Sequence, residues 1–205
     1  MSIVKILDDV TAWARQNICS KIELKVPPKL SEPNDNDYDH KKANPVAFTM
    51  YVPTDDKLPK NIPSAFPSLC VRFIKGVDDL STMTGSIGIQ FLLSVWNPGT
   101  HGADLLAPQQ GDPLSWSPVP DAEKQFERNG DGWRDVWNFT DIAVQAVESA
   151  TNISGYKIDR SIPVEFGPLT EQEAVPDYYP FWFTWVSFQL TYPLMRNINE
   201  AEDFL

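Results

Sequence analysis

The stretch SIGIQFLLSVW, residues Ser86–Trp96, alternates apolar side chains with small or polar ones. Its apolar set points to one side of an extended chain: Ile87, Ile89, Phe91, Leu93 and Val95. Near the end of the chain, PFWFTWVSFQLTY (Pro180–Tyr192) alternates in the same way from Val186 onward. Such alternation predicts strands that bury one face. We therefore expect a sheet that contains both stretches.

Apolar residues at spacings of three and four predict two helices. The first covers Ile3 to Ile18, and Pro27-Pro28 prevents its continuation. The second runs from about Gly132 to Ala150, with an apolar face broad enough to lie against a sheet. Three shorter segments are expected to be extended: Val46–Val52, Phe66–Ile74 and Tyr156–Phe166.

The order of these elements predicts an α+β fold. We expect a mixed, mostly antiparallel sheet with helices packed on one face, formed by a single domain over residues 1–205. Two stretches rich in proline, 27–45 and 97–131, are expected to be long loop insertions. Loops of this length in a compact domain often carry function.

The charge of the chain excludes one large class of partner. Its 205 residues include 28 acidic and 17 basic ones, a net charge of −11, and no cluster of Lys and Arg occurs. A protein that grips nucleic acid needs a basic surface, so we expect no stable nucleic-acid binding. The acidic charge either keeps the chain soluble or repels DNA that passes nearby. No stretch is long and apolar enough to predict a membrane span, and Lys5, Asp8 and Asp9 interrupt any signal-peptide core.

No motif predicts catalysis. His40 and His101 lie in polar loops, Cys19 and Cys70 lie in apolar surroundings, and their spacing fits no zinc site. The acidic run Asp35–Asp39 resembles the start of a calcium loop but lacks the required Gly and Glu. Phosphate-binding and nucleophile-elbow motifs are absent from the sequence. We therefore expect no enzymatic activity, metal or cofactor, two buried thiols, and a protein that acts through its surfaces.

Three stretches together resemble the tail terminator (tail completion) proteins of long-tailed bacteriophages. They are SIGIQFLLSVWNPG (Ser86–Gly99), GWRDVWNFTDIAVQAVESA (Gly132–Ala150) and PFWFTWVSFQLTYP (Pro180–Pro193), and the helical start at Ile3 fits as well. The resemblance implies a ring, usually a homohexamer, at the head-proximal end of the tail tube. Such a ring ends tube growth and joins the tail to the head or neck. Many members of the family are shorter than this chain.

The resemblance also implies partners and a location. The partners are further copies of the chain, the tail tube protein and neck or connector proteins, without a membrane. The location is the virion, after assembly in the host cytoplasm. We expect intersubunit or partner contacts at Leu105, Leu106 and Trp116 of the second loop, and at Trp182 and Trp185 of the uncharged aromatic strand. The alternative for the second loop is an exposed insertion without contacts.

Two other functions stay open at this point. Another neck, tube or baseplate protein of the virion could share a small α+β fold. A metal-dependent hydrolase would instead use His40, His101 and nearby aspartates. For the ring we also hypothesise acidic residues around the lumen, because they would let DNA pass without adhering.

Overall fold

The computed structural model describes residues 2–28, 41–99, 106–109, 112–118, 132–171 and 174–194, with the backbone alone for 106–118. Its main sheet has seven strands in the order β3-β4-β5-β11-β9-β8, and β10 also pairs with β11. These strands are β3 (Val46–Thr49), β4 (Ser68–Asp79), β5 (Thr84–Trp96), β8 (Asn152–Ile153), β9 (Tyr156–Ile158), β10 (Glu165–Pro168) and β11 (Phe181–Pro193). The pairings are antiparallel apart from β3 with β4, which is parallel. The predicted α+β class is confirmed.

The two stretches that predicted the sheet form its central pair. β5 and β11 run antiparallel along their whole lengths, with Trp96 opposite Phe181 at one end and Thr84 opposite Pro193 at the other. Between these ends, the rings of Phe91 and Phe188 meet edge to face at 5.0 Å. Phe91 is fully buried, so this pair lies at the centre of the core.

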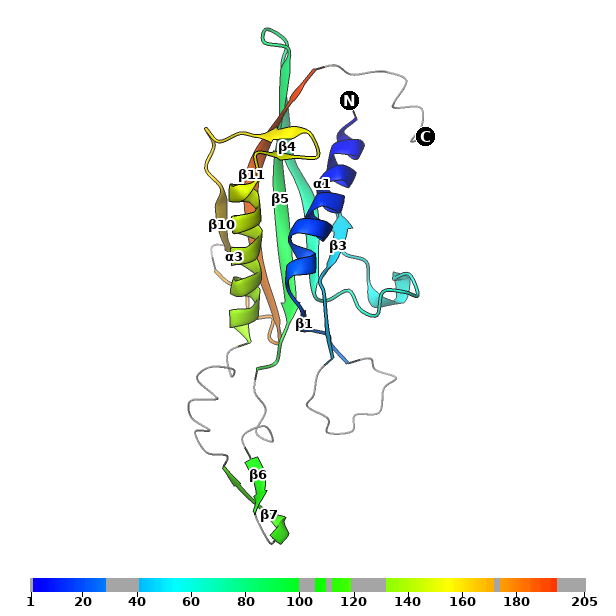
Figure 1. The fold of residues 1–205 in the computed structure, drawn as a ribbon, viewed down its shortest axis with the longest axis vertical. Helices are drawn as coiled ribbons and strands as arrows, with labels where there is room; N and C mark the ends of the chain where they lie inside the picture. Colours follow the sequence, from blue (N-terminus) through cyan, green and yellow to red (C-terminus); the bar gives the residue numbers. More distant parts are fainter. Residues whose placement is uncertain are drawn as a thin grey trace.

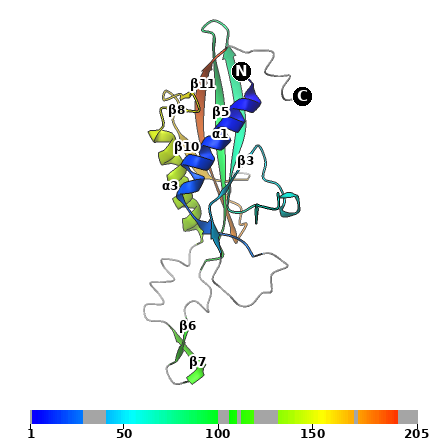
Figure 2. The ribbon, with the colours of Figure 1, turned by 45° about the vertical axis from the view of Figure 1, so that its right-hand side comes forward.

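Both helices lie on the same face of the sheet (Figures 1 and 2). Helix α1 (Ile3–Asn17) crosses β3 and β4, and α3 (Trp133–Ser149) lies over β11 and β5. The apolar positions that predicted these helices supply most of the contacts. The buried residues of α1 are Ile6, Leu7, Val10, Thr11 and Ala14, and those of α3 are Val136, Phe139, Thr140, Ala143 and Val147.

Each helix is also joined to the sheet by a hydrogen bond between two threonines. In α3, Thr140 donates to the carbonyl of Val136, so its hydroxyl oxygen accepts from Thr184 of β11 at 2.7 Å. In α1, Thr11 donates to the carbonyl of Leu7 and accepts from Thr49 of β3 at 2.9 Å. The threonine hydroxyls thus find hydrogen-bond partners next to the core, and no charged group has to be buried there.

The structure differs from the sequence prediction at several boundaries. β4 continues to Asp79, beyond the predicted end at Ile74, and carries a bulge between Phe73 and Lys75. The loop predicted at 27–45 contains β2 (Lys42–Ala43), which pairs with β1 (Leu24–Lys25). The loop predicted at 97–131 contains a hairpin of β6 (Leu106–Gln109) and β7 (Asp112–Pro118). Short 3-10 turns occupy Cys19–Lys21 and Asp55–Lys57.

Candidate functional site

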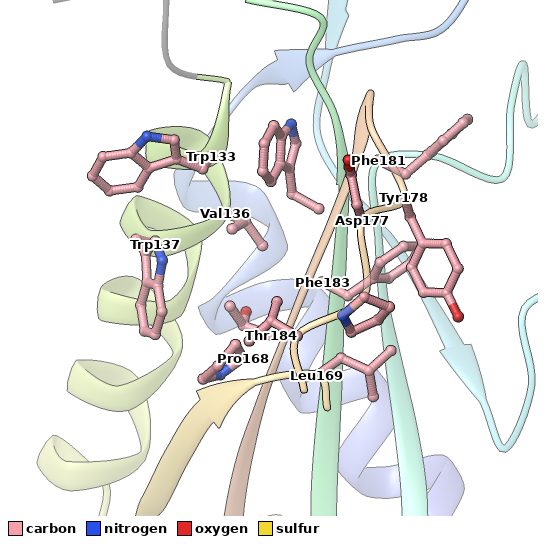
Figure 3. Close-up of a pocket in the computed structure, with 13 residues that line it drawn as sticks. Trp133, Val136, Trp137, Pro168, Leu169, Asp177, Tyr178, Phe181, Phe183 and Thr184 are labelled. Atoms are coloured by element: carbon pink, nitrogen blue, oxygen red, sulfur yellow. The ribbon is translucent and has the colours of Figure 1, made fainter. Parts of the chain in front are cut away.

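A pocket of about 460 Å³ opens beside the first residues of β11. Figure 3 shows Trp133 and Trp137 of α3 on one side and Leu169 and Tyr178 on the other. We call it the aromatic pocket and define it by six ring-bearing residues that line it: Trp133, Trp137, Tyr178, Phe181, Trp182 and Phe183. Its volume falls in the range of about 300–1,000 Å³ that is typical of ligand sites. It is larger than a second pocket of about 160 Å³, which Ile3, Phe73 and Tyr192 line with three other residues.

Asn97, just after β5, fixes the side of the pocket nearest α3. Its backbone carbonyl accepts a hydrogen bond from Trp182 Nε1 at 2.9 Å, and its backbone N–H donates to the carbonyl of Pro180 at 3.0 Å. Its side-chain amide donates to Asp135 in the first turn of α3 at 2.6 Å and accepts from Lys25 at 3.1 Å. The side chain of Asn97 is buried. One residue therefore holds the ends of β5 and β11, the start of α3 and β1 in fixed positions.

Gly132 allows this close approach. A Cβ atom added at this position would lie 2.1 Å from the carbonyl oxygen of Asn97 and 2.9 Å from Trp182 Nε1. Real Cβ atoms do not come so near to a backbone oxygen, so any larger residue would push α3 away from β5. The start of α3, and with it Trp133, depends on glycine here.

The opposite side of the pocket is formed by the segment between β10 and β11. The ring of Tyr178 meets Phe183 edge to face at 5.7 Å, and Phe66 from the segment before β4 covers Phe181 at 4.8 Å. Phe181 and Phe183 lie on the face of the sheet that the helices leave open. Phe66 and Tyr178 of the same chain cover part of their rings there.

Charged groups of both signs lie at the pocket. Asp177 lines it, and one oxygen of its carboxylate accepts the backbone N–H of Tyr179 at 3.1 Å. The Tyr178 hydroxyl donates to Glu171 at 2.5 Å, and this hydrogen bond to a carboxylate raises the pKa of Tyr178 above its ordinary value. The guanidinium of Arg134 lies over the ring of Trp133, 5.0 Å from its centroid.

The structure separates the residues predicted to make intersubunit contacts. Trp182 lines the aromatic pocket, whereas Trp185 is not among its lining residues. Trp185 packs on Gly167 and donates to the carbonyl of Pro168 at 3.0 Å. Leu106 and Trp116 belong to the β6–β7 hairpin, which Figure 1 draws apart from the sheet. Their side chains, and Leu105 altogether, lie outside the described residues. The prediction of contacts at these residues stays a prediction.

A second group of exposed apolar residues lies in the far part of β4 and in the turn that joins it to β5. It consists of four exposed residues: Ile74, Val77, Leu80 and Met83. The turn itself is held by Asp79, whose carboxylate accepts hydrogen bonds from the backbone N–H and hydroxyl of Ser81 at 2.8 and 2.6 Å. In Figure 1 this turn and the start of α3 lie at opposite ends of the sheet.

Both cysteines are buried, as predicted, and the structure shows them as free thiols. Burial raises the pKa of Cys19 to about 12 and also raises the pKa of Cys70. A protonated, buried thiol is a poor nucleophile. His40 and His101 lie outside the described residues, and the ranges that are described contain no group of three or more potential metal ligands.

The pocket joins two aromatic clusters that are separate in the sequence. Trp133 and Trp137 stand four residues apart on one helix, a spacing that places them on one face. Tyr178–Phe183 is the other cluster. Both were visible as aromatic runs, but periodicity gave no sign that they face each other. No sequence pattern indicated that Asp177 or Leu169 would line a pocket.

No family model matches the chain, and no curated protein matches it. Neither helix of the described ranges is long and apolar enough to cross a membrane.

Proposed function

We propose that this protein is a structural component of a bacteriophage virion that forms a ring at the head-proximal end of the tail tube. There it ends tube growth and joins the tail to the head or neck, and it catalyses no reaction. The observation that carries the proposal is how the three stretches resembling tail terminators fold. They form β5, α3 and β11, in which α3 packs on a central antiparallel pair. The three stretches that carry the resemblance therefore pack against one another in the folded chain.

The distribution of exposed apolar residues also supports assembly. The aromatic pocket lies at one end of the sheet and the apolar turn between β4 and β5 at the other. Exposed apolar patches commonly mark contact sites. Two different patches at opposite ends suit a heterologous contact, in which each copy uses one surface toward one neighbour and another surface toward the next. Such contacts close into a ring when the rotation between copies allows it.

The oligomeric state tests the proposal first. Native mass spectrometry and light scattering of the full chain should give a closed oligomer, with six copies expected. A protein that stays monomeric up to high micromolar concentration would count against the ring. If rings form, the surface potential of the lumen should be negative; a basic lumen would refute the idea that DNA passes without adhering.

Electron microscopy of phage particles that lack this protein tests its position. Overlong or headless tails are expected, because nothing then caps the tube. Particles without any tail would instead favour a role as another neck, tube or baseplate component. Tails of normal length on attached heads would contradict both structural roles.

A further inference from the structure

We propose that the aromatic pocket binds an arginine side chain presented by a segment of a partner protein. This goes beyond the assembly role above, in which the pocket is one of two contact surfaces, and its peptide test does not require a ring. The inference is based on the size of the pocket, the chemistry of its lining and the sign of its charge.

The volume of the pocket fits a long side chain together with part of the peptide segment that carries it. A cavity of about 150 Å³ accommodates a benzene-sized group, and this pocket has about 460 Å³. It also opens to solvent, because Trp133 keeps 40% and Tyr178 41% of their surface exposed. Val175, which lines the pocket, is 64% exposed, and Tyr179, whose ring lies 6.4 Å from that of Trp182, is 58% exposed. A ligand with apolar neighbours, such as a protein segment, would bury more of this surface than a free small molecule.

The lining favours a flat cation. The faces of aromatic rings carry negative electrostatic potential, and indole attracts cations most strongly. Guanidinium is planar and weakly hydrated, so it stacks on rings more readily than an ammonium group. Three tryptophans line the pocket: Trp133, Trp137 and Trp182. The same protein already contains one such contact, since Arg134 lies over Trp133.

The charge of the site favours a cation over a neutral group. Asp177 is the one carboxylate among the described residues that line the pocket, and its hydrogen bond from Tyr179 fixes its orientation. Glu171 accepts a hydrogen bond from the Tyr178 hydroxyl, which makes that ring more electron-rich and so a better partner for a cation. The net charge of −11 attracts basic partners at long range as well.

Two nearby positive charges oppose this preference. The start of α3 carries the partial positive charge of a helix N-terminus, but Asp135 in the first turn offsets it. Arg134 is the other, and it lies against Trp133. Removing its charge should therefore leave arginine binding unchanged or make it tighter, which gives the proposal a directional test.

The experiment uses the full chain labelled with 5-fluorotryptophan and ¹⁹F NMR. Trp133→Phe and Trp137→Phe variants assign the two resonances. The probe is the peptide acetyl-Ala-Arg-Ala-amide, and its control replaces arginine by citrulline, which keeps the shape and removes the charge. The arginine peptide should shift the Trp133 and Trp137 resonances and bind about fivefold or more tightly than the citrulline peptide, in line with the worth of a cation–π contact.

Substitutions at the rim separate this site from nonspecific attraction. Asp177→Asn removes an exposed ion pair, so it should weaken the arginine peptide by up to about fivefold and leave the citrulline peptide unaffected. Arg134→Gln should not weaken the arginine peptide. The side chains of Asp177 and Arg134 are exposed. We therefore expect both variants to fold, and circular dichroism checks this. Equal binding of the two peptides would overturn the proposal. So would binding of neither at millimolar concentration, shifts that spare both tryptophans, or a loss of arginine binding in Arg134→Gln.

Discussion

Helices α1 and α3 lie on the same face of one sheet, and each is joined to it by a threonine pair, yet they begin differently. The first turn of α1 starts on exposed Ile3 and Val4, and from Ile6 onward the helix lies against the core. The first turn of α3 is held by Asn97 and Gly132, and it presents Trp133 and Trp137 to the aromatic pocket. Two helices with the same amphipathic pattern therefore differ in what their first turns do. In α3 the start of the helix also forms one side of the aromatic pocket.

The largest effect expected from this comparison lies within α3 itself. Phe139 is fully buried, whereas Trp133 is exposed at the start of the same helix. Phe139→Ala should lower the free energy of unfolding by about 3–5 kcal/mol, because it removes core contacts and leaves a cavity. Trp133→Ala should cost less than about 1 kcal/mol. Urea unfolding measures both, and similar losses would mean that the start of α3 is as much a part of the core as its middle.

The next effect concerns the attachment of α3. Gly132→Ala forces a Cβ atom to within 2.1 Å of the Asn97 carbonyl oxygen unless the helix shifts, and overpacking of this kind costs about 1–3 kcal/mol. Gly76→Ala in β4 is the matched control, because its nearest neighbour would be at an ordinary 3.5 Å. The control should change stability by less than about 0.5 kcal/mol. Thermal unfolding of the two variants distinguishes a steric contact from a general intolerance of alanine.

A third prediction concerns Cys19, which follows the end of α1. Burial raises its pKa from 9.0 to about 12 in the folded protein. Above pH 9 the unfolded thiol ionises while the folded thiol keeps its proton, so stability falls between pH 9 and 12. At pH 10 this loss is about 1.4 kcal/mol.

Cys19→Ala removes that titration and nothing else that ionises at this position. The stability advantage of the natural protein over Cys19→Ala should therefore shrink by about 1.4 kcal/mol between pH 7 and pH 10. Urea unfolding at the two pH values gives the difference directly. An advantage that stays constant would show that the folded thiol ionises as easily as the unfolded one.

The smallest effect distinguishes the two threonine pairs. Thr140 and Thr184 are buried, whereas Thr49 is only partly buried. Thr184→Val should cost about 1 kcal/mol, since the Thr140 oxygen loses its donor away from water. Thr49→Val should cost about half as much, because water can replace the lost donor at Thr11. Equal costs would indicate that solvent reaches neither pair.

Much of the fold follows from periodicity alone. Ser86–Trp96, Gly132–Ala150 and Pro180–Tyr192 became β5, α3 and β11 with boundaries shifted by at most two residues. Long regular segments carry their pattern in themselves, and burial on one face is what the pattern encodes. The last part of β4 gave no such signal, because Lys75, Gly76 and Asp78 are poor strand formers and β5 alone supplies their pairing.

The aromatic pocket was not predictable in the same way. Its lining comes from three places in the chain, and their meeting depends on where the segment before β11 lies and on the bonds of Asn97. Asn97 appeared in the sequence only as the end of a strand. The rings at Phe181 and Phe91 are equally apolar in composition, yet one is only partly buried and the other lies fully in the core. Composition cannot separate such positions, since only distant neighbours decide which of them is covered.

The central strand pair of the sheet, β5 and β11, constrains the order in which the chain can fold during its synthesis. Residues 97–180 separate β5 from β11, so the main hydrogen-bond ladder cannot form until this whole intervening segment and β11 have left the ribosome. Contacts between such remote segments slow folding, because the intervening chain must first be closed into a loop. During that interval the edge of β5 that later pairs with β11 stays without its partner strand. Strand β4 and helix α3 precede β11 in the chain and contact β5, so they are the elements that can shield β5 from aggregation in that period.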